Sequence, residues 1–151
     1  DVLYHGPRNP MLEDYNPAEL AEKINGCSQT VLICKGNCDS EVDQLVLNTP
    51  IQSPYVHAFA DGRHIVATHG HMVESDEAKE AMAAAIKADI FISGHVHYTV
   101  LEKRGNTVFL NPGSPSLSKR EDGRQTCAVI SDVDIKVYDV NTAEVLAEFK
   151  F

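Results

Sequence analysis

One short apolar run, with the tetrapeptide that follows it, limits the fold of this chain more than any other stretch. Residues 89–93 (DIFIS) are rich in β-branched and aromatic side chains, which predicts a buried strand. The run leads directly into Gly94-His95-Val96-His97. Ligands of parallel sheets bind just beyond the carboxyl ends of the strands, so we expect His95 and His97 to face such a site. A His-x-His pair alone is a weak sign of metal binding, and its weight depends on what converges with it.

The bulk properties of the chain exclude several classes of protein. Its 151 residues suffice for one domain with a real hydrophobic core. The net charge of −9 argues against a nucleic-acid groove and against binding to an anionic membrane surface. No apolar run approaches the roughly 20 residues that a transmembrane helix needs. The four cysteines form no Cys-x-x-Cys pair, which indicates a reducing cytoplasm.

Helices and strands alternate in the first part of the predicted element order, and only strands follow in the second part. The first part is expected to hold a helix from the N-cap Asn16 to Gly26, a strand at 29–35, a short helix at 41–47, hairpin strands at 55–60 and 64–68 around Asp61-Gly62, and a helix at 76–88 capped by Ser75. After the strand at 89–93 we expect a hairpin around Gly105-Asn106 and strands at 126–131, 134–140 and 144–151. This order predicts an α/β fold of two packed sheets with helices outside.

Three of the predicted strand ends carry polar groups that suit a metal ion. These groups are Asn37, His69 with His71, and His95 with His97, and Asp1 adds a carboxylate. Mixed oxygen and nitrogen ligands suit Mn²⁺, Fe²⁺, Co²⁺, Ni²⁺ or Zn²⁺ better than Ca²⁺. A carboxylate can bridge two ions, and two ions together can activate a hydroxide and clamp a phosphoryl group.

The order of these motifs resembles a known enzyme superfamily. The motifs are Gly36-Asn37-Cys38-Asp39, Thr68-His69-Gly70-His71, Gly94-His95-Val96-His97 and Asn111-Pro112-Gly113-Ser114. Together they resemble the calcineurin-like metallophosphoesterase superfamily. The opening Asp1-Val2 with residues 5–9, and the tract 36–44, are similar to its YfcE-type bacterial phosphodiesterase subgroup.

The resemblance implies a fold, a reaction and a cofactor. The fold would be a four-layer α/β/β/α sandwich of two mixed sheets. The reaction would be phosphodiester hydrolysis by a hydroxide bridging two divalent metal ions, with Mn²⁺ preferred and Ni²⁺, Fe²⁺, Co²⁺ or Zn²⁺ as alternatives. The substrate would be a small phosphoester, and the protein would form a homodimer or homotetramer.

The resemblance also implies a role for each matching residue. Asp1 would bridge the metals, Asn37, His69 and His95 would complete the second metal, and His97 would serve the first. Asn37 and Arg8 would stabilise charge on the phosphoryl oxygens, Arg8 because guanidinium groups grip phosphate. Cys38 stands where many superfamily members have a histidine that protonates the leaving group, so that proton would come from water or from His71.

The first metal of the family also takes an Asp and a His from an Asp-x-His motif on its first strand, and none precedes Asp1 here. We therefore expect residues 1–151 to be a single metallophosphoesterase domain without its N-terminal βαβ unit, about 30 residues or more.

Several alternatives stay open at this level. His71 either faces the substrate or is a supporting or solvated histidine. His57 and His64 are expected at the surface, and Asp39 is expected to cap the helix after it. The chain could instead be a non-catalytic protein-binding scaffold of the same fold, like the retromer scaffold subunit, or a phosphomonoesterase. The presence of Asn37 and the His ligands favours an enzyme.

Overall fold

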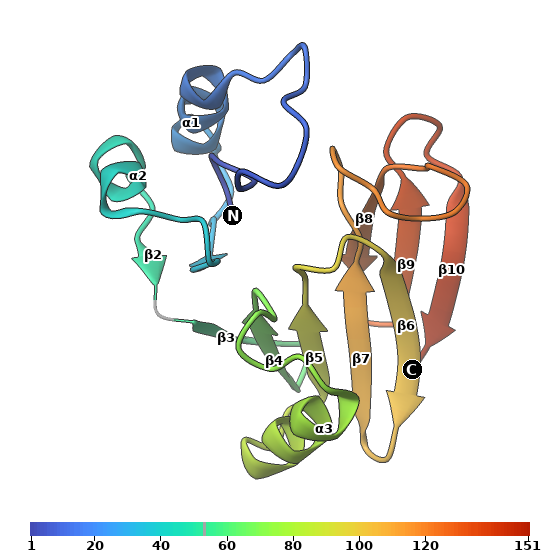
Figure 1. Ribbon diagram of the computed structural model, residues 1–151. Helices are drawn as coiled ribbons and strands as arrows, with labels where there is room; N and C mark the ends of the chain where they lie inside the picture. The colour runs from blue at the N-terminus through green and yellow to red at the C-terminus, as the bar shows by residue number, and fades with distance from the viewer. Residues whose placement is uncertain (53) are drawn as a thin grey trace.

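Ten strands and three helices make up the part of the chain that the computed structural model describes, residues 1–52 and 54–151 (Figure 1). In chain order they are α1 (Pro17–Asn25), β1 (Ile33–Cys34), α2 (Glu41–Val46), β2 (Ile51–Gln52), β3 (Tyr55–Ala60), β4 (Arg63–Thr68), α3 (Asp76–Ala85), β5 (Ile90–Ser93), β6 (Thr99–Arg104), β7 (Thr107–Pro112), β8 (Thr126–Ile130), β9 (Asp134–Asp139) and β10 (Val145–Lys150). The strands form sheets of five, three and two strands.

The five-strand sheet has the order β3-β4-β5-β7-β6 and is mixed. Strands β4, β5 and β7 run parallel, and the edge strands β3 and β6 run antiparallel to their neighbours. The buried strand predicted at 89–93 is confirmed, because β5 lies at the centre and Ile90 and Phe91 are 0% and 1% exposed. An apolar run without alternation fits a strand that is covered on both faces.

Two apolar clusters cover the two faces of this sheet. Helix α3 packs on one face through Ala83, and Ala88 just beyond its end joins it, against Val66, Phe91 and Phe109. The sheet of β8, β9 and β10 packs on the other face, where Ile135 and Val137 of β9 meet Ile90, Val108 and Leu110. The predicted α/β class with two packed sheets is therefore confirmed. The three-strand sheet is antiparallel throughout instead of mixed, because the short turns that join its strands permit only antiparallel pairing.

The first part of the chain packs around a third cluster. Leu3, Ala21, Ile33 and Leu47 form it, so α1 and α2 lie beside β1 and β2 and away from the outer face of the three-strand sheet (Figure 1). The strand expected at 29–35 is only Ile33–Cys34, because it pairs with β2 over two residues. An apolar run predicts that a segment is buried, but the length of a β-strand also depends on the length of the strand with which it forms hydrogen bonds.

The helix boundaries follow local capping. Asn16 caps α1 as predicted, with its Oδ1 accepting from the main-chain nitrogen of Glu19 at 3.2 Å. The N-cap of α2 is Ser40, which forms a capping box with Asp43, so the expectation that Asp39 is the cap is wrong. Helix α3 ends three residues before the predicted Ala88, because Lys87 adopts a left-handed φ of 54°.

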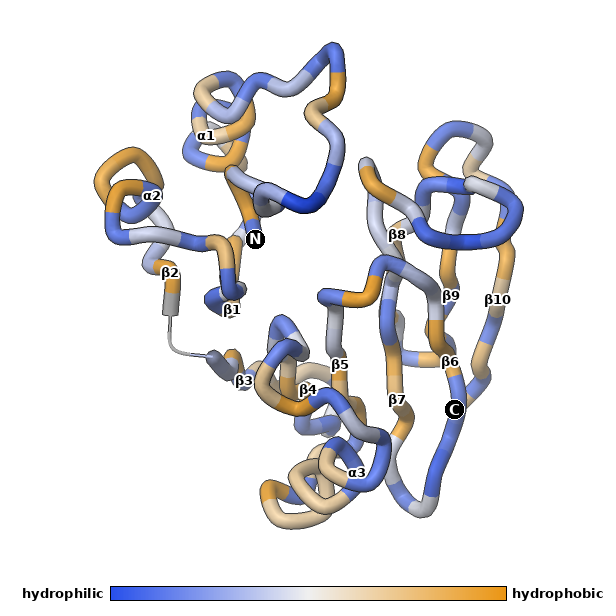
Figure 2. Tube along the Cα trace, viewed as in Figure 1, coloured by the Kyte–Doolittle hydropathy of each residue, from blue (hydrophilic) through white to orange (hydrophobic). Residues whose placement is uncertain are grey.

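The β3–β4 hairpin forms as its turn sequence predicts. Asp61 and Gly62 have φ values of 51° and 73°, which a type I′ turn requires at both central positions. Figure 2 shows the almost wholly hydrophilic tract 119–125 between β7 and β8. Among the described residues, no helix combines the length and the apolar composition that a membrane crossing demands.

Candidate metal centre

The carboxyl ends of two parallel strands bring the predicted histidines together. Thr68 at the end of β4 is the register partner of Ser93 at the end of β5. His69 and His95 follow these strands, and the nitrogen of Gly94 donates to the carbonyl of His69 at 2.9 Å. The parallel register therefore places the two imidazoles side by side, with ring centroids 5.0 Å apart.

Three side chains converge on the Nε2 atom of His69. This atom lies 3.1 Å from Asp1 Oδ2, 3.0 Å from Asn37 Oδ1 and 3.0 Å from His95 Nδ1. Ligand atoms of Asp1, His69 and His95 all lie within 4.8 Å of one another. One carboxylate, one amide oxygen and two imidazoles form a donor set that fits a first-row divalent ion. We call Asp1, Asn37, His69 and His95 the metal cluster.

The main chain holds the Asp1 carboxylate in place. Asp1 Oδ1 accepts from the nitrogen of Cys38 at 2.7 Å, which leaves Oδ2 facing His69. The main-chain nitrogens of Asp1, Val2 and Gly36 each donate to the carboxylate of Asp39 at 2.7 Å. Burial by itself raises the pKa of Asp39, but these hydrogen bonds outweigh burial and lower it. Asp39 therefore ties the segment that carries Asp1 to the loop after β1, a role that the sequence did not reveal.

The loop after β5 has a strained backbone. His95 and His97 have φ values of 70° and 66°, in the left-handed region that few residues other than glycine occupy. Asn111 Nδ2 donates to the carbonyl of Gly94 at 3.0 Å, and its Oδ1 accepts from the nitrogen of Gly113. Asn111 is 3% exposed, so a buried amide holds the loop in this shape. A polar residue at the end of the apolar strand β7 is the signal in the sequence for this role.

His97 lies outside the metal cluster. Its Nδ1 is 2.8 Å from the carbonyl of Leu117, and its own carbonyl accepts from the nitrogen of Lys119 at 2.9 Å. The segment between β7 and β8 thus fixes both the ring and the main chain of His97. Its assignment to a first metal stays a prediction.

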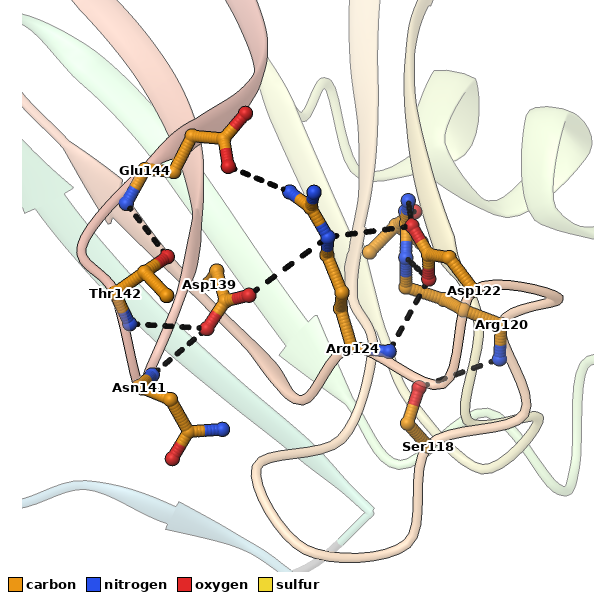
Figure 3. A network of polar contacts seen from close by, with 9 residues as sticks. Ser118, Arg120, Asp122, Arg124, Asp139, Asn141, Thr142 and Glu144 are labelled. Carbon is orange, nitrogen blue, oxygen red and sulfur yellow. Dashed lines mark hydrogen bonds and ion pairs between the residues drawn. The ribbon is translucent and has the colours of Figure 1, made fainter.

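An ion-pair network anchors the segment between β7 and β8 to the three-strand sheet (Figure 3). Asp122 accepts from Arg120 Nε at 2.9 Å and Arg120 Nη2 at 2.7 Å, and from the nitrogen of Arg124 at 3.1 Å. Arg124 also donates to Glu144 at 2.8 Å and lies 3.9 Å from Asp139 Oδ2. Hydrogen bonds from Arg120 hold the pKa of Asp122 at about 2. The network therefore stays charged and fixes the loop that holds His97.

Because His97 is predicted to serve a metal ion, replacing Asp122 with alanine should loosen this loop and weaken the predicted metal-dependent catalysis. We expect metal-dependent turnover to fall about threefold to tenfold, since small displacements of a catalytic group slow a reaction. The thermal unfolding temperature should change little, because exposed ion pairs add little stability. The matched control is Asp76→Ala, which removes an exposed partner of Arg104 on α3. Equal turnover in both variants would contradict the role of the network.

Two of the predicted catalytic residues differ in their placement. The ring of His71 lies 5.3 Å from that of His69 and 6.1 Å from that of His95, so it borders the metal cluster. Its Nδ1 is buried and has no hydrogen-bond partner in the described part of the chain, as is true of Nε2 of His5. Arg8 is exposed, and no hydrogen bond within residues 1–52 and 54–151 joins it to the cluster. The catalytic roles of His71 and Arg8 stay predictions.

Burial keeps the histidines of this region neutral. Burial lowers the pKa of His69 from its ordinary 6.5 to about 4. Burial and then the charge of a protonated His69 lower the pKa values of His71 and His95, and burial and then Lys119 lower that of His97. Neutral imidazole is the form that binds metal, so the region is prepared for cation binding at neutral pH.

The stability of the metal-free protein should therefore fall as the pH drops below 6.5. The unfolded chain takes up protons on these histidines near pH 6.5, while folded His69 resists protonation until about pH 4. Proton uptake thus favours unfolding in this window. Urea midpoints of chelator-treated protein at about pH 7.5 and about pH 5.5 measure the effect, above the range where most carboxylates titrate. A His69→Gln variant should lose less stability over the same interval, and identical midpoints in the native protein would contradict the prediction.

Three comparisons with known proteins show what the chain is similar to. The calcineurin-like phosphoesterase superfamily domain matches residues 11–135. Phosphodiesterase YfcE of Escherichia coli K12 is 36% identical over 148 residues, which cover 98% of this chain and 78% of that protein. The solved structure of YfcE, a phosphoesterase from E. coli, is similar with a TM-score of 0.85 at 32% identity, over 99% of this chain and 80% of that one.

A more distant structure shares the fold alone. Vacuolar Protein Sorting 29 from Cryptosporidium parvum is similar with a TM-score of 0.67 at 21% identity, over 89% of this chain and 77% of that chain.

Proposed function

The chain belongs to the calcineurin-like phosphoesterase superfamily and is a metal-dependent phosphoesterase, and from this premise we propose that it hydrolyses small phosphodiesters with two divalent ions. The observation that carries the proposal is the convergence of Asp1, Asn37 and His95 on Nε2 of His69. When bound, such ions supply a nucleophile from water at neutral pH and neutralise charge on the phosphoryl oxygens.

Individual residues are proposed to bind the metal ions and the phosphoryl oxygens. Asp1 is proposed to bridge the two ions, Asn37, His69 and His95 to hold one of them, and His97 to serve the other. The amide nitrogen of Asn37 faces Cys38 Sγ at 3.3 Å, and a thiol is a weak acceptor. That nitrogen can therefore turn to a phosphoryl oxygen, and Arg8 is proposed to reach the same oxygens from the surface loop.

We assign the proton of the leaving group to His71. Its Nδ1 has no partner in the described residues, and its ring borders the metal cluster. Because the pKa of His71 is lowered, the ring first takes up a proton from water and then passes it to the departing oxygen, which returns the ring to its neutral form. The thiol of Cys38 is a poorer acid for this purpose, and its contact with Asn37 is weak.

Changing Cys38 to serine should accordingly preserve most of the activity. The nitrogen of residue 38 still donates to Asp1, and the smaller hydroxyl fits where the thiol fits. We expect the turnover of a diester substrate to fall by less than about threefold, well below the cost of losing a catalytic acid. Steady-state rates of the two proteins at equal metal content measure it. A collapse of turnover in a folded Ser variant would give the thiol a chemical role.

The reaction is tested by comparing a phosphodiester with a monoester. Chelator-treated protein is reloaded with Mn²⁺, which we propose as the preferred ion, and in parallel with Ni²⁺, Fe²⁺, Co²⁺ or Zn²⁺. Bis(p-nitrophenyl) phosphate and p-nitrophenyl phosphate are then assayed under the same conditions. We expect faster release from the diester and the highest rate with Mn²⁺.

Each other outcome changes a stated part of the proposal. Faster cleavage of the monoester would make the protein a phosphomonoesterase. Bound metal without turnover of either ester would support the non-catalytic scaffold and overturn the proposal. Higher rates with another ion would change the metal and leave the reaction in place.

We further propose a cytoplasmic homodimer or homotetramer. The four cysteines in the described residues are free, as is usual in a reducing compartment. Val42, Leu45 and Val46 on α2 are 65%, 83% and 49% exposed, and association would remove this apolar strip from water. Sedimentation at micromolar concentration tests the assembly, and a monomer would contradict it.

A further inference from the structure

A second pair of histidines meets on the β3–β4 hairpin, away from the metal cluster. His57 Nδ1 lies 3.0 Å from His64 Nε2, and the two rings stack with centroids 5.2 Å apart. His64 is near the start of β4, while His69 follows its end, so about 16 Å of extended strand separates them. The pair is therefore independent of the proposed catalytic chemistry.

A carbonyl selects the tautomer of His64. Its Nδ1 lies 3.3 Å from the carbonyl oxygen of Lys87, which can only accept a hydrogen bond. Nδ1 of His64 therefore carries the proton, and the lone pair of Nε2 faces His57. Histidines that bind metal ions in proteins typically donate their other ring nitrogen to a carbonyl or carboxylate in this way.

The electrostatic surroundings of the pair favour a cation. The carbonyl of Lys87 lies just beyond the last turn of α3, where the helix dipole is negative. Asp89 Oδ2 accepts from the main-chain nitrogen of His64 at 2.8 Å, which adds a carboxylate at this residue. Of the neighbouring cations, Lys87 is exposed to water, and the guanidinium of Arg63 stacks on Phe151 at 3.6 Å.

Packing fixes one ring and leaves the pair open to solvent. Phe59 stacks on His64 with centroids 4.5 Å apart and planes at 6°, which holds the imidazole in its orientation. His57 is exposed, and Phe59 is 78% exposed. An ion can therefore reach the two nitrogens from water, and water can complete its coordination.

We propose that His57 Nδ1 and His64 Nε2 form a surface binding site for a divalent transition ion of the Zn²⁺, Cu²⁺ and Ni²⁺ class. Two imidazole nitrogens on a tetrahedral Zn²⁺ lie about 3.3 Å apart, so the observed 3.0 Å needs only a small ring rotation. His57 moves its proton from Nδ1 to Nε2, where water accepts the hydrogen bond, and no net proton is released. The bound ion ties the edge strand β3 to β4.

Zn²⁺ binding to the whole protein tests this site. Equilibrium dialysis with metal analysis gives the Zn²⁺ content of the native protein, of His57→Phe and of His64→Phe, which keep an aromatic ring and lose the ligand nitrogen. We expect each variant to hold about one equivalent less than the native protein. The control Phe59→Leu keeps both nitrogens and should keep the native stoichiometry. All three variants should keep the native phosphodiester turnover with Mn²⁺.

A second measurement separates this site from the metal cluster. In a His95→Ala background, adding His57→Phe should still remove about one equivalent of Zn²⁺. Zn²⁺ should also raise the thermal unfolding temperature of the native protein more than that of His57→Phe. Equal Zn²⁺ content in the native protein and both ligand variants would overturn the proposal and leave the ring contact as a hydrogen bond alone.

Discussion

Replacing His95 with alanine will remove metal from the protein and lower its phosphoesterase turnover by roughly a hundredfold or more, since even supporting residues of metal sites cost 10- to 100-fold. His95 supplies one of the two imidazoles of the metal cluster, and its Nδ1 lies 3.0 Å from His69 Nε2. Metal analysis of the purified variant and steady-state turnover of a diester measure the two effects. Normal metal content in the variant would make the ligand assignment wrong.

The backbone of His95 makes a sharper control available. Alanine at a φ of 70° keeps the strain of the left-handed region, whereas glycine relieves it. His95→Gly should therefore lose metal and turnover to the same extent as His95→Ala, and yet unfold at a higher urea concentration. If both variants lost activity only in proportion to lost stability, the imidazole would be a packing residue.

Replacing Gly36 with alanine will displace the Asp1 carboxylate. A Cβ atom at position 36 would lie 2.1 Å from the main-chain nitrogen of Asp1 and 2.3 Å from its Oδ1. Such distances are far inside van der Waals contact, so one of the two segments must move. A shift of about 1 Å at a catalytic group can cost on the order of a hundredfold in rate, and overpacking costs about 1–3 kcal/mol of stability. Turnover, metal content and urea unfolding measure these changes.

A control variant at a second glycine separates the effect of a steric clash from the effect of backbone strain. Gly105, in the β6–β7 turn, has a φ of 57°, and a Cβ there would meet no atom within 4 Å. Gly105→Ala should therefore lose about 1 kcal/mol of stability and keep its turnover and metal content. Equal turnover of Gly36→Ala and the native protein would show that Asp1 is not held where the reaction occurs.

Much of the fold follows from local patterns. Asn16 before Pro17 sets the start of α1, and Asp61-Gly62 sets the β3–β4 turn, because these residues suit the backbone angles required there. The end of α3 was less predictable, since Lys87 takes a left-handed φ that its side chain does not signal. The length of β1 also depended on its partner, and two residues of β2 limit it.

For the candidate site, the types of the candidate ligand residues could be predicted from the sequence, but the spatial arrangement of their side chains could not. The order of Asn37, His69 and His95 after predicted strands predicted a cation site and correctly indicated a phosphoesterase family. Their convergence on Nε2 of His69 depends on the parallel register of β4 with β5, which local sequence does not encode. His97 shows the difference, since the structure places its ring outside the metal cluster, with Nδ1 against the carbonyl of Leu117.

The sequence by itself thus determined the α/β class and the β3–β4 turn, because backbone preferences and the periodicity of apolar residues are local properties, and it predicted the ligand types. Only the tertiary structure decided that Asp39 secures Asp1, that Asn111 holds the loop of His95, and that His57 meets His64. These contacts join residues that lie from 7 to 38 positions apart in the chain. Such pairings depend on the tertiary structure, because strand register and burial place the polar atoms within hydrogen-bond distance.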